Sequence, residues 1–182
     1  MEKLNIHEIP KDIYLIKNIP LVLHDMKTVH QLCTQKYYNH SKGCPNFNKK
    51  DGCPPHIQHI SQQYDLESMN MLLLRFPFYY YITLKQQEYP DWSLRELSNQ
   101  RHWQNHLKGT LNEYWKNIKN EYPEYKVIKN PEAQGVNVEE TLSNIDIPLN
   151  WCKQDEYENI TQVPEYMYHV YLMGKELDNQ TT

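Results

Sequence analysis

The sequence predicts a single-domain protein of the α/β or α+β class, with a small central sheet flanked by helices. Three observations support this prediction. The 182 residues fit one domain. Hydrophobic residues make up 39% and charged residues 23%, as in ordinary folded globules. Apolar runs typical of strands alternate along the chain with segments of helical periodicity, which favours sheet packed against helix but leaves the strand order open.

Apolar and aromatic runs predict the strands. The strongest run, 71–84, is too continuously apolar to leave one face in water, so at least part of it is expected to be a central buried strand. Pro77 interrupts it and, lacking an N–H, implies a bulge, a break or an edge. Shorter strands are expected at 13–16, 21–23, 125–128 and 166–173.

Helical spacing of apolar residues predicts one long helix from Asp91 to about Asn120, which Pro123 follows. Asn137 is a natural N-cap for a helix that ends near Asn144. Two further short helices are expected at about 28–36 and 57–64.

Three of the four cysteines, Cys33, Cys44 and Cys53, fall in one stretch. This stretch, 33–59, is rich in Gly and Pro and is expected to be a loop that binds a metal. The N-terminus lacks an apolar run behind a basic start, and no segment is long and apolar enough to span a bilayer. We therefore expect a cytoplasmic, reducing setting, where clustered cysteines are typical of metal-binding or catalytic sites.

The spacing of the cysteines favours an iron–sulfur cluster. Structural zinc sites mostly use pairs of cysteines separated by two to four residues, and these three lie further apart. Iron–sulfur clusters take thiolate ligands, often four, and Cys152 is the only other cysteine. If Cys152 is not a ligand, one iron of a [4Fe-4S] cluster stays open and can activate a small substrate, as in an iron–sulfur-dependent lyase or a sulfur-handling enzyme.

Zinc is the alternative. His56 and His59 follow the last cysteine of the stretch, so Cys44 and Cys53 with both histidines make a possible Cys₂His₂ site, in which Cys33 can replace one histidine. That site would stabilise an interaction module without catalysis. In a third interpretation the cysteines are reduced, buried and inert.

The same residues resemble a family. The pattern Cys…Gly-Cys-Pro-Asn-aromatic…Cys-Pro-Pro is similar to that of the "predicted metal-binding protein" family, small cysteine-containing proteins of archaea and anaerobic bacteria. The matching segments, which keep the family's order, are Cys33, Gly43-Cys44-Pro45-Asn46-Phe47, Cys53-Pro54-Pro55, Trp92-Ser93…Arg95…Asn99…Trp103-Gln104, and Pro131 to Thr141. The resemblance implies a metal-binding, iron–sulfur role for the three clustered cysteines. Many family members carry further cysteines just before the last segment, but 125–130 has none here, so one centre is expected.

Other polar residues are candidates for positioning a substrate. Arg75 interrupts an apolar run and needs a carboxylate or an anionic ligand, unless its side chain reaches the sheet edge. Glu132 is a candidate carboxylate or only a turn residue. His102 and His106 are expected to share one helix face, solvated or facing a substrate.

The charge balance limits the partners. The formal net charge of −4 argues against a general nucleic-acid binder, which needs a basic face. The expected partner is a small-molecule substrate or a protein, without a membrane.

Overall fold

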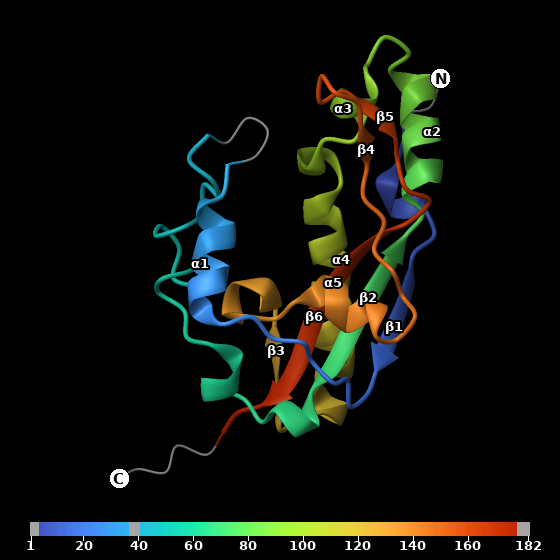
Figure 1. Ribbon diagram of the computed structural model, residues 1–182. Helices are drawn as coiled ribbons and strands as arrows, with labels where there is room; N and C mark the ends of the chain where they lie inside the picture. Colours follow the sequence, from blue (N-terminus) through green and yellow to red (C-terminus); the bar gives the residue numbers. More distant parts are fainter. Residues whose placement is uncertain (1–3, 37–40, 178–182) are drawn as a thin grey trace. The chain divides into compact units, whose positions relative to one another are not determined.

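A computed structural model describes residues 4–36 and 41–177 and shows a mixed α/β fold with a four-stranded antiparallel sheet (Figure 1). The expected class is therefore confirmed. β3 runs antiparallel to β6, with Tyr125 opposite Lys175. The strands lie in the order β1 (Asp12–Ile16), β2 (Asn70–Phe76), β6 (Met167–Lys175) and β3 (Tyr125–Ile128).

The chain divides into two compact units, each built from three separate stretches. The first unit contains the described residues up to Tyr14 together with Leu73–Ile118 and Leu149–His169. The second unit contains Leu15–Leu72, Lys119–Pro148 and the described residues from Val170 onward. Strands β1, β2 and β6 each pass along the chain from one unit into the other.

The apolar run at 71–84 is a strand followed by a helix, so its first part is the expected strand and its second part is not. Every residue of β2 except Arg75 is buried, as expected for a central strand. Pro77 then marks the break, and α2 (Phe78–Glu88) follows it directly. In the helix Tyr79 and Tyr80 are 61% and 50% exposed, whereas Tyr81 is buried. The aromatic residues of the helix therefore lie in two environments, one buried and one exposed to solvent. Composition alone does not distinguish them.

The expected long helix at 91–120 is interrupted. It comprises α3 (Leu94–Leu97), the 3-10 turn η4 (Gln100–His102), α4 (Gln104–Ile118) and the 3-10 turn η5 (Lys119–Glu121). Ser93 and Glu96 form a capping box at the start of α3. The side chain of Asn99 accepts a hydrogen bond from Arg101 N and so starts a new turn. The local caps at these polar residues divide the helix, although its apolar spacing continues.

Most of the shorter elements agree with expectation. Helix α1 (Met26–Thr34) and helix α5 (Val138–Ser143) are present, and β3 has the expected bounds. At 21–23 the structure has only a bridge from Leu23 to Val136. The segment 57–64 contains only a 3-10 turn, η2 (Ile60–Gln62). The elements that the patterns did not predict are η1 (Ile6–Glu8), η3 (Leu66–Ser68), η6 (Pro131–Gln134), β4 (Lys153–Gln154) and β5 (Ile160–Gln162).

Each unit has its own apolar centre. In the first unit the indole of Trp103 stacks on Phe76 with ring centroids 6.3 Å apart, and its Nε1 donates to Ser98 O. In the second unit Met69, Leu72 and Leu172 are fully buried. None of the helices in the described part of the chain is long and apolar enough to cross a membrane.

Candidate metal centre

Helix α1 places the first cysteine. Asp25 caps the helix by accepting a hydrogen bond from Thr28 N at 2.7 Å, and the same bond lowers the pKa of the Asp25 carboxyl. Cys33 is the penultimate residue of the helix and is half-buried. Its position at a helix end leaves its carbonyl available to a residue outside the helix.

Gly43 brings the second cysteine to the first. Cys44 N donates to Cys33 O at 2.7 Å, which ties the loop to the end of α1. Gly43 has a φ of 77°, and a Cβ there would lie 2.5 Å from Cys33 O and 2.7 Å from the carbonyl carbon of Thr34. Only glycine allows this approach, so the Gly-Cys pair has a structural cause.

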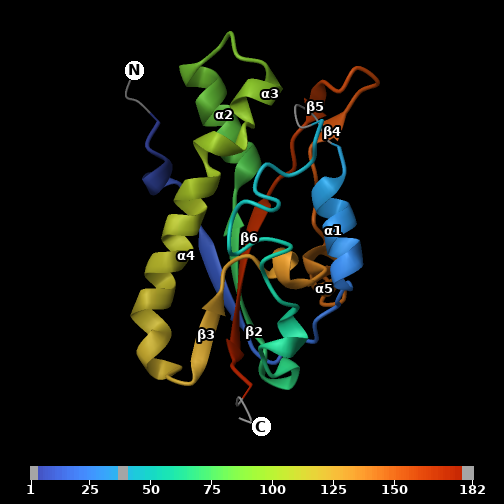
Figure 2. The same cartoon turned by 90° about the vertical axis from the view of Figure 1, so that its left-hand side faces the viewer.

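A turn places the third cysteine. Cys53 N donates to Lys50 O at 2.9 Å, and Asn48 N donates to Pro54 O at 2.8 Å. His30 of α1 also makes an edge-to-face contact with Phe47 of the loop, with centroids 5.8 Å apart. The loop after residue 40 and α1 lie side by side in both views (Figures 1 and 2).

Neighbouring thiols affect Cys33 and Cys53 electrostatically. Burial raises the pKa of Cys33, and the neighbouring Cys44 and Cys53 raise it further. Burial and Cys44 also raise the pKa of Cys53, against the opposing effect of the Lys50 ammonium. These are the thiols expected to act together, and we call Cys33, Cys44 and Cys53 the thiol cluster. Among residues 4–36 and 41–177, no group of three or more His, Cys, Asp or Glu side chains is arranged to hold a metal ion.

His59 is engaged elsewhere. Its Nε2 lies 3.0 Å from His24 O, and since a carbonyl only accepts, Nε2 carries the proton. Its Nδ1 then accepts from Ser61, whose Oγ lies 2.7 Å away. Both ring nitrogens are therefore in use, and a Cβ at Gly135 would lie 2.6 Å from Nε2. His56 is exposed beside the turn, and its backbone N–H donates to Cys53 O.

The segment that contains Glu132 lies close to the thiol cluster. It forms η6, which packs against α1, and the side-chain nitrogen of Asn130 lies 3.9 Å from where a Cβ at Gly52 would be. Glu132 itself is exposed. Gln134 is buried and accepts from Gln63 Nε2 at 3.2 Å. Two of the segments that carry the family resemblance therefore meet in one unit.

Cys152 belongs to the first unit, whereas the thiol cluster belongs to the second. Cys152 is half-buried, and burial raises its pKa against the opposing effect of Arg95. Its role as a fourth ligand stays a prediction.

Arg75 has a carboxylate partner. Its Nη2 and Nε donate to Asp12 Oδ2 at 2.7 and 3.1 Å, and this hydrogen bond raises the pKa of the guanidinium. The guanidinium carbon also lies 4.7 Å from the ring centroid of Tyr166 and 5.7 Å from that of Tyr14. Asp12 thus meets the need of this arginine for a negative charge, which leaves less reason to expect a substrate there.

The two helical histidines do not share a helix face, because His102 ends η4 and His106 lies on α4. His102 packs on Trp92 with centroids 5.5 Å apart, and its pKa is lowered by burial and by Lys85. His106 meets His7 edge-to-face at 4.2 Å. Burial, then Lys11 and His7, lower the pKa of His106 to about 4.

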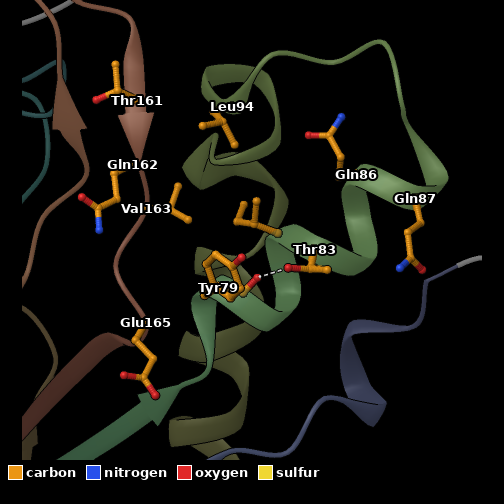
Figure 3. A pocket seen from close by; sticks show the side chains of 10 residues that line it. Tyr79, Thr83, Gln86, Gln87, Leu94, Thr161, Gln162, Val163 and Glu165 are labelled. Atoms are coloured by element: carbon orange, nitrogen blue, oxygen red, sulfur yellow. Dashed lines mark hydrogen bonds between the residues drawn. The ribbon is translucent and has the colours of Figure 1, made fainter.

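A pocket that the sequence did not indicate lies in the first unit (Figure 3). It has a volume of about 570 Å³ between α2, α3 and the segment of β5. The pocket residues Tyr79, Ile82 and Thr83 fall in the run that was expected to be a strand at least in part, and β5 had not been expected, so no sequence pattern connected the two sides. Backbone bonding holds the two sides together, because Tyr79 N donates to Glu165 O at 3.2 Å.

Comparisons of the chain with protein-family models, curated proteins and solved structures give no match.

Proposed function

We propose that the chain binds one iron–sulfur cluster, of the [4Fe-4S] type, through Cys33, Cys44 and Cys53. The observation that carries this proposal is the backbone bond that joins Cys44 to Cys33 near the end of α1, and neighbouring thiols also raise the pKa values of Cys33 and Cys53. Thiolates are the ligands that such clusters require. The Cys44-to-Cys33 backbone bond holds these two residues next to each other, which supports a shared site.

The zinc module is the weaker candidate. Its Cys₂His₂ form needs a free nitrogen on His59, and both nitrogens of that ring are hydrogen-bonded. A zinc site would then depend on the thiols and on His56 alone.

Bound with three cysteines, such a cluster supplies a Lewis-acidic iron that can activate a small substrate, for example in sulfur removal, sulfur transfer or a non-redox elimination. The chain's part in that chemistry is to hold the thiolates. Asn130, the N-cap of η6, lies beside Gly52 of the loop, and Glu132 is an exposed carboxylate of the same segment, so these two are our candidates for orienting a substrate. We place the protein in the cytoplasm, where thiols stay reduced.

Anaerobic purification tests the proposal. We expect a brown protein that contains iron and acid-labile sulfide. A colourless protein loaded with zinc would contradict it.

The variant Cys152→Ala separates a closed site from an open one. If the cluster remains, three cysteines suffice and one iron is open; if it is lost, Cys152 completes the ligand set. A Cys53→Ala variant that keeps its full iron content and its fold would count against both the cluster and the zinc module.

A further inference from the structure

The pocket of the first unit has an apolar floor and a polar rim. The floor is formed by Ile82 of α2, which is 4% exposed, by Val163, which is 7% exposed, and by Leu94 of α3. Tyr79 stands at the side with its ring exposed to solvent (Figure 3). A volume of about 570 Å³ suits a small molecule. We call this site the α2–β5 pocket.

Several rim groups direct their hydrogen-bond donors into the protein. The hydroxyl of Thr83 donates to Tyr79 O at 2.9 Å, and that of Thr161 donates to Lys153 O at 3.4 Å. Gln86 Nε2 lies within 3.4 Å of the carbonyl oxygens of Tyr89, Pro90 and Trp92. The hydroxyl lone pairs and the Gln86 amide oxygen are thus the polar functions that these residues have left to offer a ligand.

The charge of the rim has one sign. Glu165 is the one charged side chain among the described residues that line the α2–β5 pocket. Its carboxylate is exposed and accepts hydrogen bonds only. The face of the Tyr79 ring carries the negative side of an aromatic quadrupole, which attracts cations. A carboxylate, hydroxyl acceptors and an aromatic face therefore lie around one apolar floor, together with the amides of Gln87 and Gln162, which can accept as well as donate.

We propose that the α2–β5 pocket binds small organic cations, namely an ammonium or guanidinium group on an apolar stem. The stem lies on Ile82, Val163 and Leu94, while the cationic head donates to the Glu165 carboxylate and to the rim oxygens. The ring of Tyr79 covers the head or the stem. This site is independent of the thiol cluster, because none of its residues belongs to the cysteine loop.

The test uses three probes of nearly equal shape and different charge, namely phenethylammonium, 2-phenylethanol and phenylacetate. Each is titrated into the full-length protein labelled with ¹⁵N. We expect phenethylammonium to shift the amide signals of α2 and of 161–165 saturably, with a Kd of about 1 mM, as befits a ligand of this size. The neutral and anionic probes should bind at least about fivefold more weakly, because they lack the charge-assisted hydrogen bond.

Three variants sharpen the result. Glu165→Gln and Tyr79→Ala should each raise the Kd for phenethylammonium about threefold or more. Tyr80→Ala is the matched control, since Tyr80 is equally helical and similarly exposed but does not line the pocket, and it should leave the Kd unchanged. No saturable shift at 20 mM probe, equal binding of phenylacetate, or an equal effect of Tyr80→Ala would each overturn the proposal.

Discussion

The thiol cluster and the α2–β5 pocket are assembled in opposite ways. The thiol cluster comes from one stretch of chain, and a backbone bond of 2.7 Å between neighbouring parts of that stretch joins two of its members. The α2–β5 pocket joins α2 and α3 to β5, about 70 residues further along the chain. The residues that line this pocket share no sequence motif.

The difference shows what kind of site a single sequence reveals. A local site leaves a pattern of residue types because turn chemistry and ligands are close in sequence. A site assembled from distant segments depends on which elements form and pair, so it becomes visible only when the fold is known. The two sites also differ in what their backbone bonds join, since Cys44 N to Cys33 O links parts of one stretch and Tyr79 N to Glu165 O links distant segments.

The largest expected effect is at Gly43, whose substitution breaks the local site. Gly43→Ala puts a Cβ against the backbone of Cys33 and Thr34 at a left-handed φ of 77°. We expect this variant to lower the free energy of unfolding by about 2–4 kcal/mol and to lose most of its bound iron. Chemical denaturation and metal analysis measure both effects.

Gly109→Ala is the matched control for that variant. Gly109 lies inside α4, and a Cβ there meets nothing within 4 Å. Alanine should raise the free energy of unfolding by about 0.5–1 kcal/mol, because it restricts the unfolded chain and favours helix. If both variants behave alike, Gly43 does not have the role that we assign to it.

Because of Lys85, we expect the free energy of unfolding to depend on pH in the alkaline range. It is 6% exposed, its Nζ lies 2.9 Å from Tyr81 Oη, and burial lowers its pKa to about 8 against the opposing effect of Glu88. The unfolded chain binds this proton more tightly, so stability should rise by about 1–3 kcal/mol as the pH increases from 8 toward 10. In Lys85→Met, denaturation curves over this range should lose that rise. An unchanged slope would contradict the buried environment of the lysine.

His106 gives a smaller effect at acid pH. Its pKa in the fold is about 4, below the ordinary 6.5, so the unfolded chain binds more protons between these values. Stability should therefore fall as the pH drops from 6.5 to 4, by about 1–2 kcal/mol from this group after allowance for its partial exposure. The variant His106→Phe keeps an aromatic ring beside His7 and should be less sensitive to acid. Thermal melts from pH 7 to pH 4 compare the two proteins.

The smallest effect is expected at the Arg75–Asp12 ion pair. Both side chains are well exposed, at 35% and 54%, so their interaction is screened by water. Asp12→Asn should change the free energy of unfolding by less than about 1 kcal/mol. A larger loss would show that the pair anchors the sheet.

Several elements could be predicted because local chemistry determines them. β3 coincides with a short apolar run, and α5 begins at the side-chain cap that Asn137 provides. Pro77 was expected to interrupt the run at 71–84, but the helix after it was not predicted, because Tyr79, Tyr80 and Tyr81 suit a strand equally well. The interruption of the helix at Asn99 was missed for a related reason, since apolar periodicity continues across it.

For the candidate site, the sequence indicates the cysteine stretch, while its metal stays a prediction. The three clustered cysteines and their loop follow from the sequence, and the fold explains why a glycine precedes Cys44. The engagement of His59 could not be foreseen, because its partner, the carbonyl of His24, lies 35 residues away and carries no side-chain signal. The same limit hid the carboxylate partner of Arg75.

Iron content across three single cysteine variants tests the central claim most directly. Anaerobically prepared wild-type protein should contain about four iron and four sulfide per chain, as a [4Fe-4S] cluster requires. Cys33→Ser, Cys44→Ser and Cys53→Ser should each lose most of both, while circular dichroism reports whether the fold persists. Variants of the thiol cluster that keep their fold and the full iron content of the wild type, or a wild-type protein that binds only zinc, would contradict the account.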